Sequence, residues 1–171
     1  MRQAHVIRYL VVATVHVDTG RESLKPSPEA QGSGVKLLGV TALTHLKQGD
    51  LEAMGLAREY ARDLTKLVLL RAGIARAAGC DGVVCAGTEA RAVKKEFGPD
   101  FLVVCPGIRP AWAAVPGDDQ QRVMTPYEAI QAGADYIVVG RPIRLAPDPA
   151  AAADKVVAEI EQGMCDRSGP S

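Results

Sequence analysis

The sequence lacks any excess of charge of one sign. Its 20 Lys and Arg residues balance 20 Asp and Glu residues, and its pI is about 6.8. The basic residues are scattered, and their longest run is Lys94-Lys95. Proteins that bind nucleic acid or anionic membranes usually carry a concentrated basic patch, so the composition excludes both kinds of partner.

Long apolar runs are also absent. No stretch approaches the roughly 18 apolar residues that a membrane-spanning helix needs. The apolar run near the N-terminus is interrupted by Arg8, and no small-residue cleavage site follows it, so we expect no secretion signal. These features predict a cytoplasmic protein.

The four cysteines form no CxxC pair and have no nearby histidine at the spacing of a zinc site. Cys85 and Cys105 lie inside apolar runs, where a free cysteine behaves as a small hydrophobic residue. We therefore expect reduced core thiols, no metal site and no catalytic cysteine.

Five apolar, β-branched runs are present instead. They are continuously apolar rather than alternating, which is typical of parallel strands covered on both faces. With 47% hydrophobic residues in 171, the chain can bury one core, so residues 1–171 are expected to form a single domain. The predicted strands are residues 11–17, 35–43, 82–87, 101–107 and 136–140.

Helical patterns lie between these runs, and the alternation predicts βα units around a parallel sheet. Two prolines and a Gln-Gly-Ser-Gly sequence make residues 19–34 mostly loop, and residues 164–171 are expected to form a flexible tail. The first predicted helix covers residues 51–79 and carries Tyr60, Leu64, Leu67 and Val68 on one stripe. A second runs from Thr88 to before Gly98, and a third runs from the capping box Thr125-Pro126-Tyr127-Glu128 to Gly133. The last runs from Asp148-Pro149 to near Gly163, with Val156, Val157 and Ile160 inward.

Five βα units cannot close an eight-stranded barrel, which typically takes about 250 residues. The chain therefore forms either an open, doubly wound sheet or the back part of a barrel.

In both architectures function gathers at the carboxyl ends of the strands. Arg109 and Arg141 follow Gly107 and Gly140 at the ends of the last two predicted strands. A glycine lets the backbone approach a ligand, and an arginine offers a planar fork of donors to two phosphate oxygens. This pattern indicates a phosphate site. The alternative is that both arginines tie loops to the carboxylates of residues 118–119.

Several segments resemble the bacterial orotidine 5'-phosphate decarboxylase family: "VTALTHL", "GVVCAGTEA", "FGPDFLVVCPGIRP" and "GDDQQRVMTPYEAIQAGADYIVVGRPI". The resemblance runs from about residue 10 to the last helix, and "VHVDTGRE" looks like the fourth barrel strand and its loop. It implies an α/β fold, namely the C-terminal part, about five βα units, of a phosphate-binding (β/α)8 TIM barrel. The family is usually homodimeric and converts orotidine monophosphate to uridine monophosphate (UMP) without metal or organic cofactor.

The resemblance also implies roles for individual residues. Arg109 and Arg141 would bind the 5'-phosphate, with the Gly140 backbone beside them. Gln120 would bridge phosphate and pyrimidine, and Thr44 would line the pocket.

Some of these roles have alternatives. Gln120 could be solvated, and Thr44 could cap the following helix. Gly107 is a further candidate for the site. His45 stands where the family commonly has a serine that contacts the pyrimidine amide, and its larger, titratable ring puts that contact in doubt.

The family's catalytic motif, D-x-K-x-x-D, does not occur in this sequence, and Lys25 and Lys36 lack flanking carboxylates. We therefore expect the first three βα units and the catalytic network to be missing. The chain would then be a fragment, the product of a mis-called start, or one half of a split gene. Alone it would be inactive and would associate with itself, and in the split-gene case an N-terminal half would complement it. The alternatives are a non-catalytic phosphate- or nucleotide-binding half-barrel module and a related barrel enzyme that acts on a sugar phosphate.

Overall fold

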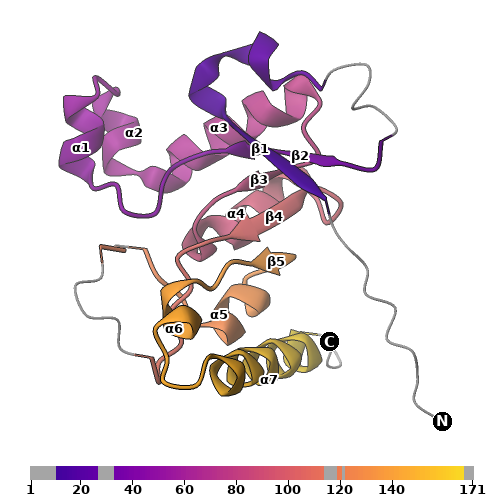
Figure 1. Ribbon diagram of the computed structural model, residues 1–171. Coiled ribbons are helices and arrows are strands. Elements are labelled where there is room, and N and C mark those ends of the chain that lie inside the picture. The colour runs from indigo at the N-terminus through magenta and orange to yellow at the C-terminus, as the bar shows by residue number, and fades with distance from the viewer. Residues whose placement is uncertain (1–10, 27–32, 114–118, 121, 168–171) are drawn as a thin grey trace.

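The computed structural model describes residues 11–26, 33–113, 119–120 and 122–167. In this part of the chain five parallel strands form one sheet in the order β1-β2-β3-β4-β5, so strands adjacent in sequence are adjacent in space (Figure 1). The predicted strand order is confirmed, although the strands are shorter than the apolar runs. They are β1 (Val12–His16), β2 (Lys36–Val40), β3 (Gly82–Val84), β4 (Leu102–Cys105) and β5 (Tyr136–Ile137).

Helices join consecutive strands, except between β1 and β2, where the described connection holds two short 3-10 helices, η1 (Val17–Thr19) and η2 (Arg21–Leu24). None of the helices described is both long and apolar enough to cross a membrane. The α-helices are α1 (Gln48–Ala53), α2 (Arg58–Arg62), α3 (Leu64–Ala78), α4 (Gly87–Phe97), α5 (Pro126–Gln131), α6 (Arg141–Arg144) and α7 (Pro149–Arg167).

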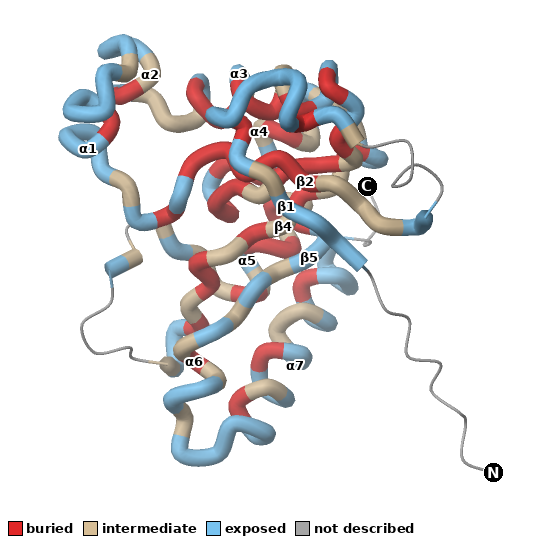
Figure 2. Tube along the Cα trace, turned by 45° about the horizontal axis from the view of Figure 1, so that its top comes forward, coloured by how far each residue is buried: buried red, intermediate tan, exposed pale blue. Residues whose placement is uncertain are grey.

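The core lies between the sheet and these helices. A Cβ at Gly39 would lie 2.8 Å from Ala75 Cβ of α3, which identifies the sheet face that the helices cover. Val83 and Val103 stand in register with Gly39 and are fully buried (Figure 2). Cys85 and Cys105 are also free and fully buried, as predicted. Contact with Cys105, together with burial, raises the pKa of the Cys85 thiol, so this thiol is a packing group.

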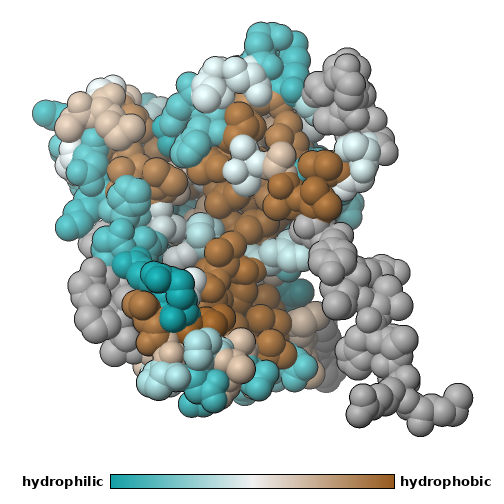
Figure 3. All heavy atoms as spheres, in the orientation of Figure 1, coloured by the Kyte–Doolittle hydropathy of each residue, from teal (hydrophilic) through white to brown (hydrophobic). Residues whose placement is uncertain are grey.

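The opposite face of the sheet is apolar but much less covered. Tyr136 and Val138, at alternate positions along the last strand and its extension, are 43% and 52% exposed, and Val12 at the other edge is 42% exposed. Figure 3 shows apolar residues gathered over the middle of the face on which Figure 1 displays the strands. In a closed barrel this face would be filled by layers of side chains from all strands.

The uncovered face and the sheet edges should make the chain associate. Within the described residues β1 and β5 are the outer strands, and unpaired strand edges invite pairing. We expect a dimer or larger species in sedimentation velocity, and Val138→Lys should shift it toward monomer. Val157→Lys is the matched control, because Val157 is equally exposed but lies on α7. A stable 18 kDa wild-type species would contradict the expectation.

The predicted helix over 51–79 is wrong as a single element. The segment forms α1, α2 and α3, because Gly55 adopts a left-handed φ of +82° after α1. Asp63 then starts α3 by accepting a hydrogen bond from the Lys66 N–H. The expected buried stripe survives within α3, where Leu67 and Val68 are buried.

The last helix also differs from the prediction. Val156 is buried, but Val157 is 49% exposed, so its inward assignment is wrong. Gly163 does not end α7, which continues to Arg167, and residues 164–167 of the expected tail are therefore helical. A Cβ at Gly163 would lie 3.1 Å from Ile130 Cβ, so this glycine provides a close helix contact with α5. Residues 168–171 lie outside the described part.

Candidate phosphate site

The carboxyl ends of β2, β4 and β5 carry the residues that the sequence singles out. Because these strands are parallel members of one sheet, their carboxyl ends lie at one edge. In chain order, this edge carries Thr44 and His45 after β2, Gly107 and Arg109 after β4, and Gly140 and Arg141 after β5.

Thr44 and Gln120 meet at this edge, because the Thr44 hydroxyl donates a hydrogen bond to Gln120 Oε1. Gly107 makes that meeting feasible. A Cβ there would lie 3.0 Å from Gln120 Oε1 and 3.3 Å from Thr44 Cγ2, and the φ of +76° is left-handed. The glycine therefore allows close approach, as predicted for a strand end, but the neighbours are protein side chains.

The two alternatives for these polar residues are wrong. Thr44 is buried and does not cap a helix, since the residue before α1 is Lys47. Gln120 is half-buried and bonded to Thr44, so it is not simply solvated. His45 is exposed in the turn beside them, and its contact with a pyrimidine stays a prediction.

Arg109 belongs to a segment that pairs with the chain after Gln120. Its backbone N–H donates to Met124 O at 2.9 Å, next to a parallel bridge between Ile108 and Met124. Its guanidinium donates to Ile108 O at 2.9 Å. These bonds hold the segment after β4 against the loop that carries Gln120.

Arg141 is the first residue of α6, and it pairs with Asp119 at 2.5 Å. The hydrogen bond from Arg141 lowers the pKa of the Asp119 carboxyl below its usual range. The sequence left open that an arginine ties a loop to a carboxylate, and one contact of Arg141, the pair with Asp119, is of this kind. Among the described residues, none lies within 4 Å of a Cβ built at Gly140. Asp118 lies outside the described residues.

A pocket of about 400 Å³ adjoins Arg141 on the side of α6 and α7. Its walls include Trp112, whose ring lies 5.3 Å from Lys155 Nζ, and whose indole N–H donates to Glu159. Trp112 is the only tryptophan in the sequence, so its fluorescence reports on events near Arg141.

The two lysines considered for catalysis lie away from this edge. Lys25 pairs with Glu22 on an exposed turn, and Lys36 pairs with Asp81 at 2.8 Å. Lys36 begins β2, at the amino end of the sheet, and its carboxylate partner comes from elsewhere in the chain rather than from flanking positions. Neither lysine is placed to serve the strand ends that carry the arginines.

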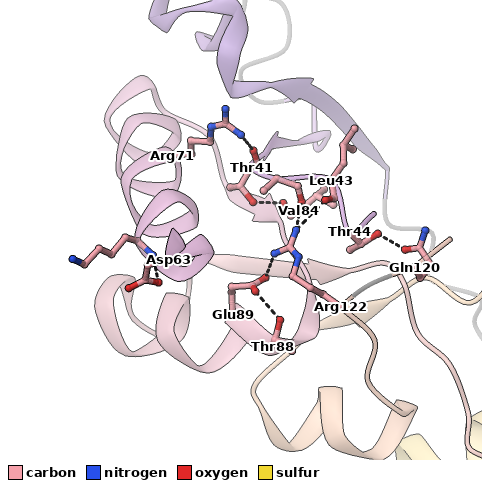
Figure 4. Close-up of polar contacts among 12 residues, drawn as sticks. Thr41, Leu43, Thr44, Asp63, Arg71, Val84, Thr88, Glu89, Gln120 and Arg122 are labelled. Atoms are coloured by element: carbon pink, nitrogen blue, oxygen red, sulfur yellow. Dashed lines mark hydrogen bonds and ion pairs between the residues drawn. The ribbon is translucent and has the colours of Figure 1, made fainter. Parts of the chain in front are cut away.

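Sequence reasoning missed a buried ion pair at the same edge. Arg122 Nη1 lies 2.8 Å from Glu89 Oε2, and their side chains are only 11% and 4% exposed (Figure 4). Each residue lies within a segment quoted for the family resemblance, "DQQRVMTP" and "GTEA", but nothing in the sequence indicates that the two meet.

Parallel strands joined by helices that cover one face define an α/β protein of the (β/α)8 barrel class. The crystal structure of orotidine 5'-phosphate decarboxylase from Lactobacillus acidophilus matches with a TM-score of 0.69 and 34% identity, over 88% of this chain and 63% of that one. The enzyme of that name from Sulfolobus solfataricus, 19% identical with a TM-score of 0.58, supports the fold alone.

The sequence comparisons agree with the fold. Proteins named orotidine 5'-phosphate decarboxylase are 44% identical over 152 residues in Desulfosudis oleivorans and 47% identical over 154 residues in Methylobacterium sp. (strain 4-46). These matches cover 89% and 90% of this chain but only 61% and 63% of the relatives.

A family model described as Orotidine 5'-phosphate decarboxylase / HUMPS family matches residues 8–156. The chain belongs to this family. The prediction of five βα units from a (β/α)8 barrel is confirmed, and the chain spans about three fifths of the length of its relatives.

Proposed function

We propose that this chain is an orotidine 5'-phosphate decarboxylase polypeptide that supplies the phosphate-binding part of the site. The observation that carries the proposal is the arrangement at the last two strand ends. Arg109 and Arg141 follow adjacent parallel strands, and Gln120, held by Thr44, lies in the loop between them. The substrate class is a pyrimidine nucleoside monophosphate, orotidine or uridine monophosphate, as the family membership suggests.

In this proposal the two guanidinium groups hold the phosphate oxygens by charge-assisted hydrogen bonds. The Gly140 backbone, which has no described residue within 4 Å of a Cβ built on it, approaches the same phosphate. Gln120 then stands between phosphate and pyrimidine, with Thr44 fixing its amide orientation. A phosphate at this place has to compete with the Asp119 carboxylate for Arg141.

The catalytic part of the proposal concerns what the chain supplies to a complete barrel. No D-x-K-x-x-D motif occurs in these 171 residues, so we propose that three further βα units provide it and cover the apolar face of the sheet. The assembly would act in pyrimidine biosynthesis in the cytoplasm, without metal or organic cofactor, and would form homo-oligomers. A non-catalytic nucleotide-binding half-barrel is the second candidate.

Calorimetry on the purified chain tests the phosphate site. We expect UMP to bind and uridine, which lacks the phosphate, to bind at least about 30-fold more weakly, as the loss of a charge-assisted contact of about 2 kcal/mol predicts. Quenching of Trp112 should follow the same titration. Equal affinity for UMP and uridine would refute a site organised around the phosphate.

A further inference from the structure

We infer that Arg122 and Glu89 form a positioning pair that holds the Gln120 loop over the ends of β2 and β3, and so sets the affinity for the nucleotide. This inference rests on the proposed function, since Gln120 is its route to the ligand. Arg122 and Glu89 themselves are buried within the protein and have no assigned contact with the substrate.

The contacts of Arg122 reach two other segments of the chain. Its Nη2 donates to Ala42 O at 3.2 Å and to Leu43 O at 3.0 Å, in the turn that leads to Thr44. Its Nη1 faces the Glu89 carboxylate in the first turn of α4 (Figure 4). One side chain thereby ties the Gln120 loop to the segments that follow β2 and β3.

Glu89 is suited to receive this charge. It lies at the amino end of α4, where the helix dipole favours a carboxylate, and Thr88 Oγ1 donates to its Oε1 at 2.6 Å. The carboxylate is 4% exposed, so without Arg122 it would be a buried, uncompensated charge. Glu89 Oε2 and Arg122 Nη1 approach to 2.8 Å without the alignment of a hydrogen bond, so charge attraction holds them together, and the bonds from Thr88 and to the 42–43 turn fix the two side chains.

Gln120, Arg122 and Met124 are held at alternate positions. Gln120 accepts from Thr44, Arg122 meets Glu89, and Met124 O accepts from Arg109 N. Arg122 donates to Ala42 O and Leu43 O, and Gln120 accepts from Thr44 in the same turn, so loss of the Arg122 contacts releases the turn to which Gln120 is bonded. The Arg122 carbonyl also lies 3.4 Å from a Cβ built at Gly107, which places the loop backbone against the end of β4.

The first test needs no ligand. Trypsin cleaves after arginine, and the buried Arg122 should be cut slowly in the wild type. In Glu89→Gln we expect the segment around Arg122 to open locally more often. Cleavage after Arg122, measured by mass spectrometry, should therefore be about tenfold faster. Cleavage after exposed Arg144 should not change, and cleavage after Arg71, buried in α3, should not accelerate. Equal acceleration at Arg71 would show general destabilisation and overturn the inference.

The second test is a double-mutant cycle on UMP affinity. Arg122→Met should weaken UMP binding about tenfold, within the usual range for coupled neighbours, but should have no further effect in a Gln120→Ala background. Additive losses would overturn the inference. The Glu89→Gln/Arg122→Met double variant removes both buried charges, so it should keep the wild-type melting temperature yet bind UMP as weakly as Arg122→Met.

The two tests separate this inference from the proposed function. If the wild-type chain does not bind UMP, the proposed function fails, but the trypsin experiment still decides whether the pair holds the loop. If UMP binds and the cleavage rate after Arg122 is the same in Glu89→Gln and wild type, the positioning role fails and the phosphate site stands.

Discussion

Purified alone, this chain should not decarboxylate orotidine monophosphate at a detectable rate. The reaction replaces a carboxylate at C6 of the pyrimidine with a proton, and the carbanion that forms needs a nearby cation and a proton donor within hydrogen-bond reach. The strand ends described here supply arginines, which are poor proton donors because a guanidinium stays protonated, and one imidazole, His45, but no lysine flanked by carboxylates. Lys36, the lysine that starts β2, belongs to the opposite end of the sheet.

Binding energy at the phosphate cannot replace these groups. An enzyme uses contacts with a remote part of the substrate to reach the transition state at the reacting atom, and this works only if the reacting atom meets complementary groups. Here the described contacts join Thr44 to Gln120 and Arg141 to Asp119, and in the proposed function these residues serve phosphate and amide recognition rather than chemistry at C6. We therefore expect binding without turnover.

The measurement is the loss of orotate absorbance over time, with and without a second polypeptide that carries three βα units and the D-x-K-x-x-D motif. Activity should appear only in the mixture. The matched control is the same polypeptide with the motif lysine replaced by alanine, which should assemble but remain inactive. Turnover by the single chain would show that its catalytic groups lie among residues other than those assigned here.

The fold could be predicted largely from the sequence because burial on both faces leaves a strong local signal. Continuous apolar runs and glycine or proline at the boundaries located all five strands. The boundaries of the helices were predicted less well. The break at Gly55 depends on a backbone conformation, and the close contact at Gly163 depends on a second helix. Neither feature can be read from periodicity.

The sequence predicted some residues of the site and missed others, because contacts between distant segments leave no local pattern. Gly107 was selected for the approach of a ligand, and this stays a prediction, because its neighbours in the structure are the side chains of Thr44 and Gln120 from other loops. The Arg122–Glu89 pair was missed because 33 positions separate its members, and an isolated Glu in a helix normally faces solvent. The pattern at the strand ends indicated a phosphate site at Arg109 and Arg141, the family resemblance added roles for Gln120 and Thr44, and all four roles remain proposals.

Replacing Arg141 with alanine should weaken UMP binding about 30-fold, the equivalent of about 2 kcal/mol for a charge-assisted, two-oxygen contact. Arg141 follows Gly140 at the end of β5, and its side chain is 30% exposed, so it can meet a ligand without a rearrangement of the core. Arg144→Ala is the control. Arg144 is exposed in the same helix and should leave the affinity unchanged.

Replacement of Asp119, the carboxylate partner of Arg141, should change the UMP affinity in the opposite direction. It therefore tests the mechanism rather than the fold. Asp119 pairs with Arg141 and remains ionised because that hydrogen bond depresses its pKa. Asp119→Asn removes a negative charge that competes with the phosphate, so UMP should bind more tightly in calorimetry at neutral pH, with uridine unaffected. If Arg141→Ala and Asp119→Asn both leave UMP affinity at the wild-type value, Arg141 holds only the loop and the phosphate assignment is wrong.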